Sequence, residues 1–317
     1  MEIYFYPLCA MLVAALLVLV TGPKMIPELH KLKFGQSIRE EGPKSHQAKS
    51  GTPTMGGIMI ILSLAIVSAV FGPLSLELGL ALLITLGHFL LGFLDDYIKV
   101  VKKQNLGLKA KQKLLGQIVI AVLVAYFGGL PTDLWVPFVG NIDLGPAFYA
   151  LLLFVLVGTS NAVNLTDGLD GLASGTVIAA SLSYMVICLW QGKPELAVFC
   201  GAMAGACLGF LKFNAHPAKI FMGDTGSLAL GGALAAAGIL THTEVLLAII
   251  GIIFVCEAMS VIIQVTSFKT TGKRVFLMSP IHHHFELKGW SETRVVRTFW
   301  FIGLVGGIAG LLLYKIG

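Results

Sequence analysis

Seven acidic residues stand in short polar segments between long apolar runs, and their chemistry is suited to metal and phosphate binding. Mg²⁺ prefers oxygen ligands and usually takes one or two protein carboxylates together with phosphates. Neighbouring acids at the edge of an apolar run repel each other, which is costly unless Mg²⁺ or lysines lie nearby. This placement predicts an active site at a membrane surface. The seven residues are Asp95, Asp96, Asp167, Asp170, Asp224, Glu286 and Glu292.

Asp167 and Asp170 belong to a segment that also carries Asn164, Thr166 and two glycines. The two acids are three residues apart, so they would share one face of a helix. Each is followed by glycine, which lets a ligand approach the backbone. Asn, Thr and Asp side chains offer donors and acceptors for a sugar, a base or a hydrated cation. The alternative is that these residues only cap the start of a helix.

A lysine and a glycine-rich turn precede the second apolar run, at Lys49 and residues 51–57. Backbone N–H groups in such a turn can bind an anion. The turn is not a P-loop, because Walker A requires Lys and then Ser or Thr after the Gly at position 56, where this chain has Gly57 and Ile58. A flexible turn at a helix start is the alternative.

Three consecutive histidines, residues 282–284, stand shortly before Glu286. Successive side chains on a helix are about 100° apart, so the three cannot all face one ion, and a zinc triad fits poorly. Hydrogen bonds to phosphate oxygens are more natural, with a solvated turn as the alternative. Asp224 could be a metal ligand or a helix N-cap. In the preceding apolar run, Glu257 and Gln264 form a same-face polar pair that either function or helix packing would explain.

The composition is that of a membrane protein. Of 317 residues, 56% are hydrophobic and 12% are charged, and the mean hydropathy is +0.86, which excludes an ordinary soluble globular protein. We expect a single polytopic domain over residues 1–317. The five cysteines all fall in apolar runs, so no disulfide is expected. The first run lacks a basic n-region and a cleavage site, so we expect it to stay as a helix.

The apolar runs predict an all-α integral membrane protein with about ten transmembrane helices. Residues 130–145, between the fourth and fifth runs, are expected to form a small hairpin or a turn-rich loop. The predicted crossings lie near residues 3–22, 55–72, 74–94, 114–129, 146–163, 172–190, 196–213, 226–241, 244–267 and 298–316.

The basic residues predict how the chain is oriented, because Lys and Arg accumulate on the cytoplasmic side of membrane proteins. Twenty of the 22 lie in the gaps 23–54, 95–113, 212–225 and 268–297, and only Lys193 and Lys315 lie opposite. With ten crossings, these gaps share one side only if both termini are outside. The active site is therefore expected on the cytoplasmic face.

Five motifs resemble, in their order and topology, those of the phospho-N-acetylmuramoyl-pentapeptide transferases, within the polyprenyl-phosphate N-acetylhexosamine-1-phosphate transferase superfamily. The similarity covers essentially the whole chain, and five motifs together are very specific. They are residues 49–57 (Lys-Ser-Gly-Thr-Pro-Thr-Met-Gly-Gly), 95–97 (Asp-Asp-Tyr), 164–171 (Asn-Leu-Thr-Asp-Gly-Leu-Asp-Gly), 221–226 (Phe-Met-Gly-Asp-Thr-Gly) and 280–286 (Pro-Ile-His-His-His-Phe-Glu).

The resemblance implies an enzyme of peptidoglycan synthesis in the bacterial cytoplasmic membrane. Such an enzyme transfers phospho-MurNAc-pentapeptide from UDP-MurNAc-pentapeptide to undecaprenyl phosphate, forming lipid I and UMP, with Mg²⁺ as cofactor. The resemblance also implies a homodimer in the lipid bilayer, and no nucleic-acid partner is expected.

Residue roles follow from the resemblance at the matching positions. Asp224 would hold the metal, and Asp95 and Asp96 would be the catalytic carboxylates. The side chains of His282, His283 and His284 would contact phosphates, with His283 among the catalytic residues, and Lys99 and Lys111 would join the charge cluster. Phe221 would stack on uracil, and Asn214 would lie nearby. The nucleotide pocket would be lined by Lys49, Thr54, Asn164, Asp167, Gly168, Leu169, Asp170 and Phe221.

The sequence alone leaves other classes of protein to consider. A sister transferase that uses another UDP-sugar is the nearest alternative, and segment 280–286 favours the muramoyl-pentapeptide substrate. A secondary transporter would place its carboxylates near the midplane, whereas these are expected beyond helix ends. A CDP-alcohol phosphotransferase would need an Ala-Arg pair after the Asp-Gly step, and residues 172–174 lack Arg. The sequence does not decide between one-step transfer and a covalent intermediate on Asp95. It also leaves open the third residue of the accepted pentapeptide and the length of the polyprenyl chain.

Overall fold

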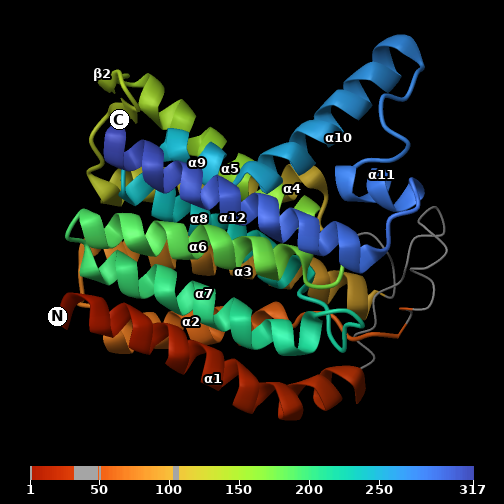
Figure 1. Ribbon diagram of the computed structural model, residues 1–317. Coiled ribbons are helices and arrows are strands. Elements are labelled where there is room, and N and C mark those ends of the chain that lie inside the picture. Colours follow the sequence, from red (N-terminus) through yellow and green to blue (C-terminus); the bar gives the residue numbers. More distant parts are fainter. Residues whose placement is uncertain (1, 32–48, 50, 103–106) are drawn as a thin grey trace.

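The computed structural model describes residues 2–31, 49, 51–102 and 107–317, and it confirms an all-α membrane protein (Figure 1). A single two-stranded sheet accompanies the helices in this part of the chain. The elements are α1 (Glu2–Lys31), α2 (Gly57–Phe71), α3 (Leu76–Val101), α4 (Ala110–Gly128), β1 (Asp133–Val136), β2 (Gly140–Asp143), α5 (Ala147–Thr166), α6 (Leu172–Trp190), α7 (Pro194–Asn214), α8 (Gly223–Leu240), α9 (Glu244–Ile250), α10 (Ile252–Thr271), α11 (Ile281–Leu287) and α12 (Glu292–Ile316).

Each predicted crossing corresponds to helix. Within the described ranges, nine helices are long and apolar enough to span a bilayer, and α2 adds a shorter apolar helix of 15 residues. The ninth predicted crossing, 244–267, is divided at Gly251 into α9 and α10. A Cβ at Gly251 would lie 2.8 Å from the Leu247 carbonyl oxygen, so glycine fits at this break. Beyond the break, α10 leaves the bundle at an angle (Figure 1).

Several helices run further than hydropathy predicted. Helix α1 continues to Lys31 rather than ending near residue 22, and α3 continues to Val101. Asp95 and Asp96 therefore lie inside the last turns of α3, and our expectation that they lie beyond a helix end was wrong. Hydropathy marks where apolar surface stops, whereas backbone hydrogen bonds carry a helix on. An ion pair between Asp95 and Lys99, four residues apart, supports this extension.

Helix α8 lies at the centre of the bundle, packed on α3 and α5 and also touching α2, α6, α7 and α9. It is the least hydropathic and the most buried of the nine candidate spans. Glycines allow these close approaches, because a Cβ at Gly57 of α2 would overlap the Gly226 backbone and one at Gly92 of α3 would overlap the Asp224 carbonyl. The start of α8 is thus pressed against both α2 and α3.

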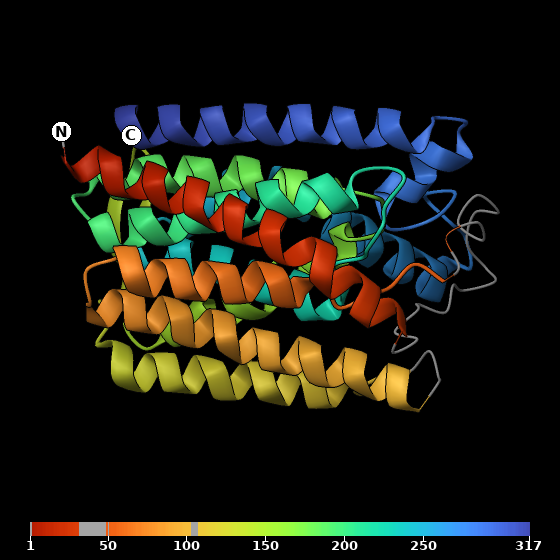
Figure 2. The same ribbon diagram turned by 90° about the horizontal axis from the view of Figure 1, so that it is seen from below.

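The polar motifs and the chain termini lie at opposite ends of the bundle. Both termini and the β hairpin gather at one end, and α11 and the loop that joins α5 to α6 lie at the other (Figures 1 and 2). The predicted hairpin is confirmed, with Asp133 opposite Asp143 and Val136 opposite Gly140 in an antiparallel register. Which end faces the cytoplasm stays a prediction from the basic residues.

Candidate active site

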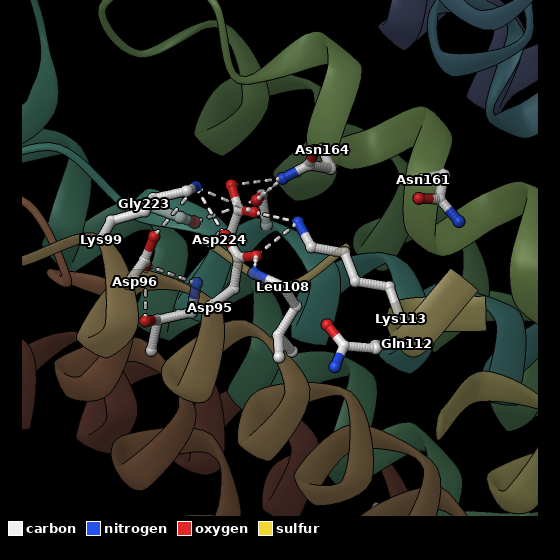
Figure 3. Close-up of polar contacts among 12 residues, drawn as sticks. Asp95, Asp96, Lys99, Leu108, Gln112, Lys113, Asn161, Asn164, Gly223 and Asp224 are labelled. Atoms are coloured by element: carbon white, nitrogen blue, oxygen red, sulfur yellow. Dashed lines mark hydrogen bonds and ion pairs between the residues drawn. The ribbon is translucent and has the colours of Figure 1, made fainter. Parts of the chain in front are cut away.

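Three carboxylates converge where α3 ends and α8 begins. Asp95 and Asp96 come from α3 and Asp224 from the first turn of α8, and one oxygen of each lies within 4.8 Å of the others (Figure 3). Asp95 and Asp96 are buried, and Asp224 is partly exposed. Asp224 follows Asp96 by 128 residues in the sequence, and the close contact of α3 with α8 brings the two segments together.

Two lysines neutralise most of this charge. Lys99 Nζ lies 2.6 Å from Asp95 Oδ2 and 3.3 Å from Asp224 Oδ2. The Lys113 ammonium, from α4, lies 2.6 Å from the same Asp224 oxygen and 3.1 Å from Asp95 Oδ1. Asp224 is therefore bridged to α3 and α4 by two cations, as Figure 3 shows. Charge pairing of this kind offsets the cost of holding carboxylates together in a low dielectric.

Neutral donors fix the orientation of each carboxylate. Asp96 Oδ2 accepts hydrogen bonds from the backbone N–H and the hydroxyl of Thr225, at 2.9 and 2.7 Å. Asp95 Oδ1 accepts from the Leu108 N–H at 2.7 Å. Asn164 Nδ2, from the last turns of α5, donates to Asp224 Oδ1 at 3.0 Å. The site is thus preorganised by α3, α5, α8 and the segment before α4.

The donor set fits a hard divalent cation. Three carboxylates meet two ammonium groups among the described residues, which leaves one negative charge in excess. All three acids offer oxygen, the ligand type that Mg²⁺ takes in preference to nitrogen or sulfur. Asp224, the most accessible of the three, is best placed to coordinate an ion that also binds substrate phosphates.

Lys113 occupies the position that we expected for Lys111. Lys111 is exposed in the first turn of α4, and within the described part of the chain no ion pair joins it to the three carboxylates. Residues two apart on a helix point to different sides, so only one of the pair can face the site. A substrate contact for Lys111 stays a prediction.

The glycine-rich turn is paired by its backbone with the segment before α8. Phe221 N–H donates to the Pro53 carbonyl at 2.8 Å, and Gly56 N–H donates to the Phe221 carbonyl at 2.9 Å. Gly223 has φ 72°, and a Cβ there would lie 2.5 Å from Asp96 Oδ2 and 2.7 Å from Thr54 Oγ1. Thr54 and Phe221 therefore adjoin the carboxylates. Ser50 of this motif lies outside the described residues.

A second charged cluster lies at the loop between α5 and α6. Lys49 Nζ is 2.7 Å from Asp170 Oδ1 and 2.6 Å from Glu292 Oε1. His216 Nδ1 is 3.0 Å from Asp170 Oδ2 and 3.4 Å from Glu292 Oε2. Asp170, His216 and Glu292 could together hold a metal ion, although Lys49 already pairs with both acids. Lys49 and Asp170 were expected in one pocket. Glu292 was one of the seven acids that predicted an active site but had no assigned role, and His216 was not predicted, because only its polar setting was a signal.

The same loop and the last residue of α7 provide further predicted pocket residues. Burial raises the pKa of the Asp167 carboxyl well above its usual value, and the charges of Asp224 and Asp96 raise it further. Leu169 is buried in an apolar cluster with residues of α10 and α12. Asn214 is buried, where its Oδ1 accepts from the Gly171 N–H at 3.1 Å and its Nδ2 donates to the Ile220 carbonyl at 3.0 Å. Asn214 thus holds the loop to the segment before α8.

The three histidines lie on the short helix α11 and point to different partners. His282 is buried, with Nδ1 3.0 Å from Glu257 Oε1 and its ring beside Gly168. His283 Nδ1 lies 2.8 Å from Glu286 Oε2. His284 Nδ1 accepts from the Leu277 N–H at 3.1 Å. This divergence agrees with the argument against a shared metal ion.

Comparisons with known proteins match both the whole chain and its first motif. The model of glycosyl transferase family 4 matches residues 78–242, and signature 1 of the phospho-N-acetylmuramoyl-pentapeptide-transferases matches residues 49–61. A phospho-N-acetylmuramoyl-pentapeptide-transferase of Geobacillus sp. (strain WCH70) is 58% identical over 95% of this chain and 96% of its own length. That of Bacillus subtilis (strain 168) is 58% identical over 96% of each chain.

The matched regions include all of the described carboxylate cluster. Residues 78–242 contain Asp95, Asp96, Lys99, Lys113 and Asp224, and residues 49–61 contain the turn that adjoins them. With near-complete coverage at 58% identity, the chain belongs to the phospho-N-acetylmuramoyl-pentapeptide-transferase family.

Proposed function

We propose that this protein transfers phospho-MurNAc-pentapeptide from UDP-MurNAc-pentapeptide to undecaprenyl phosphate, giving lipid I and UMP. The observation that carries the proposal is the convergence of Asp95, Asp96 and Asp224 with Lys99 and Lys113 at one end of the bundle. The name and the 58% identity of the relatives support the same reaction. We place the enzyme in a bacterial cytoplasmic membrane, with this end facing the cytoplasm, and we propose a homodimer from the family resemblance.

The position of the cluster suits a reaction between a lipid and a soluble nucleotide. One substrate stays in the bilayer, whereas the other carries charged phosphates that cannot enter it. Only a site at the membrane surface can meet both. Asp95, Asp96 and Asp224 lie at helix ends near the motif loops, which is where such a meeting is possible.

The reaction is a substitution at phosphorus. An oxygen of the lipid phosphate attacks the phosphorus that carries the sugar, the bond from this phosphorus to the bridging oxygen breaks, and UMP leaves with that oxygen and its electron pair. A phosphate monoester has a second pKa of about 6, so the nucleophile is mostly dianionic at neutral pH. The main task of the site is therefore to neutralise charge and hold the reactants in line.

The residues of the cluster divide this task between them. Lys99 and Lys113 provide positive charge for the phosphate oxygens, and Asp224 is the residue that we propose as the main Mg²⁺ ligand. Bound Mg²⁺ would supply Lewis-acid stabilisation of charge on the phosphate oxygens. We propose that Asp95 orients the lipid phosphate or removes its remaining proton, while Asp96 is held in place by Thr225.

The pocket for the nucleotide would lie between the glycine-rich turn and the loop that joins α5 to α6. Phe221 is half-buried at this place and could stack on uracil. Lys49 and Asp170 are hydrogen-bonded to each other at the loop, and both could turn to a ligand. His282, His283 and His284 would contact phosphates from the side of α11, and Asn164 would keep Asp224 oriented.

A transfer assay with purified protein in detergent tests the proposal. Release of UMP should require UDP-MurNAc-pentapeptide, undecaprenyl phosphate and Mg²⁺ together. Asp224→Ala should lower the rate by about 100-fold or more, because a ligand and an ion-pair partner of both lysines are removed. Asp143→Ala, an exposed carboxylate at the hairpin end, is the matched control and should keep the wild-type rate.

The choice of substrate separates the neighbouring possibilities. UDP-GlcNAc in place of UDP-MurNAc-pentapeptide should give no UMP. Release from UDP-GlcNAc instead would identify a sister transferase, and no release from either nucleotide would refute a transferase function.

A further inference from the structure

Glu257 is a buried acid in the second turn of helix α10, one of the candidate membrane spans. Its side chain is 0% exposed, and both of its carboxylate oxygens face one partner, lying 3.0 and 3.1 Å from His282 Nδ1. An ionisable residue within a membrane helix is costly and persists when it has a defined partner or task. The partner here is one of the histidines that the proposed function places against phosphate.

The other nitrogen of the His282 ring has no such partner. Nε2 is buried and, among the described residues, makes no hydrogen bond. It is aimed at the loop that joins α5 to α6, because a Cβ added at Gly168 would overlap it. Gly168 lies between Asp167 and Leu169, in the loop that we propose lines the nucleotide pocket. A buried polar nitrogen without a partner that faces a ligand loop is suited to bind a ligand atom.

Helix α10 also holds the segment that leads to α11. Gln264, seven residues after Glu257 and on the same face, accepts from the N–H groups of Val275 and Phe276 at 3.0 and 2.9 Å. Its Nε2 donates to the Phe276 carbonyl at 2.9 Å. Glu257 and Gln264 thus fix the histidine helix at two points, which accounts for the polar pair in an apolar run.

The chemistry of a carboxylate paired with a histidine determines what Nε2 can do. An ionised Glu257 can only accept, so Nδ1 carries a proton and donates. When Nε2 carries a proton as well, the negative charge of Glu257 lies beside the positive ring and compensates it. A ring in this state donates from Nε2 to an anionic oxygen, and that bond is charge-assisted.

We propose that Glu257 is a positioning residue that orients the His282 ring and lies beside it as a compensating negative charge, so that Nε2–H binds a phosphate oxygen of the nucleotide substrate. The inference rests on the proposed function, since it requires a diphosphate ligand beside Gly168. It assigns to α10 a task besides spanning the bilayer. The alternative is that Glu257 only fills space in the packing of α10 against α11.

Binding of two ligands that differ only in phosphate distinguishes these roles. UDP carries the diphosphate and uridine does not, so the ratio of their affinities isolates the phosphate contribution. In Glu257→Gln, which keeps the shape but not the charge, UDP affinity should fall by about tenfold or more while uridine affinity is unchanged. The measurement is equilibrium binding to purified protein in detergent with Mg²⁺ present. Glu244→Gln, another buried glutamate at the opposite end, is the matched control and should change neither affinity.

A double-mutant cycle shows whether Glu257 acts through His282. In a His282→Gln background, Glu257→Gln should not lower the ratio further, because the donor is already absent. An equal further loss in that background would overturn the proposal. Loss of both UDP and uridine binding in Glu257→Gln would also overturn it, because such a loss indicates a structural role. An unchanged ratio of UDP to uridine affinity in Glu257→Gln would overturn it as well.

Failure of the proposed function has a different signature. Wild-type protein that released no UMP, or bound UDP no more tightly than uridine, would refute the transferase site itself. Wild-type protein that does both, with an unchanged ratio in Glu257→Gln, would refute only the positioning role.

Discussion

Asp167 differs from the other acids of the site in its electrostatic surroundings. Asp95, Asp96 and Asp224 are paired with Lys99 or Lys113, whereas no ion pair in the described part of the chain involves Asp167. Burial raises its pKa well above the ordinary value, with a further contribution from Asp224 and Asp96. The folded protein therefore keeps a proton on Asp167 at a pH where the unfolded chain has released it.

This shift predicts how stability depends on pH. As the pH rises from the ordinary value of about 4 towards the raised pKa, the unfolded chain binds fewer protons than the folded one, so Asp167 makes the fold progressively less stable. The Asp167→Asn variant has no carboxyl group at this position, so it lacks this loss of stability with rising pH. The Tm of the variant in detergent, without Mg²⁺ or nucleotide, should match the wild type near pH 4 and exceed it by about 2 °C or more at pH 8.

Asp143 provides a control, because its pKa is shifted in the opposite direction to that of Asp167. Hydrogen bonds from the Gly145 N–H and the Thr132 hydroxyl lower the pKa of this exposed carboxyl. Its stabilising effect is present above the ordinary pKa and is lost as the pH falls, so Asp143→Asn should show its largest Tm deficit at neutral pH. A Tm difference for Asp167→Asn that did not change with pH would contradict the first prediction.

Individual residues also mark the limit of what the sequence predicts. Spacing marked seven acids, and the family resemblance singled out the three carboxylates that the structure brings together. Neither indicated which lysine of α4 would face them. The choice of Lys113 over Lys111 depends on the rotation of α4 about its axis, which packing decides. Glu292 was among the seven acids but had no assigned role, and His216 was not predicted, because only the fold brings these two residues to each other and Glu292 to Lys49.

At the scale of elements, close helix packing depends on glycine. A Cβ at Gly205 of α7 would overlap the backbone carbonyl of Met11 in α1. The backbone cannot move aside as a flexible side chain can. The absence of a side chain at residue 205 therefore allows α1 and α7 to approach this closely, and Gly201 and Gly209 do the same beside Pro7 and Ala15.

Gly205→Ala should separate these two helices. We expect a loss of about 1–3 kcal/mol in unfolding free energy, typical of overpacking, observed as a lower Tm in detergent. Gly158→Ala in α5 makes the same chemical change at an exposed position with open space around the Cβ. Alanine is the better helix former, so this control should keep or slightly raise the Tm. Equal losses in the two variants would argue against the packing explanation.

The elements themselves were largely predictable, and their ends were not. Long apolar runs correctly located ten helices and the hairpin between α4 and α5. Hydropathy does not report backbone hydrogen bonding, so it missed the last turns of α1 and α3 and the break at Gly251. The short helix α11 was not predicted, because seven residues are too few to show a helical pattern of hydrophobic residues.

At the scale of the whole molecule, the arrangement of the two ends predicts a topology. The hairpin and both termini lie at one end, and the end of α3 and the start of α4 lie at the other (Figures 1 and 2). Asp95 and Lys113 bring the carboxylate cluster to these segments. Twenty of the 22 basic residues lie in the gaps that we place on the cytoplasmic side. The hairpin should therefore face outwards and the start of α4 should face the cytoplasm.

Cysteine labelling of intact cells checks this orientation. In a variant without the five native cysteines, Asn141→Cys should react with a membrane-impermeant maleimide, because it is exposed in the hairpin. Lys111→Cys is equally exposed but should react only after the cells are permeabilised. Reaction of both sites in intact cells would contradict the separation of the two ends, and reversed accessibility would contradict the charge rule.

The enclosed position of α8 has a consequence for how the chain is inserted during synthesis. A helix rich in glycine and alanine is only weakly favoured by lipid, and α8 instead fills a slot between other helices. All of its neighbours except α9 precede it in the chain, so they have left the ribosome before it does. Lys99 and Lys113 have emerged by then as well. Asp224 is thus translated after both of the ammonium groups that will neutralise it.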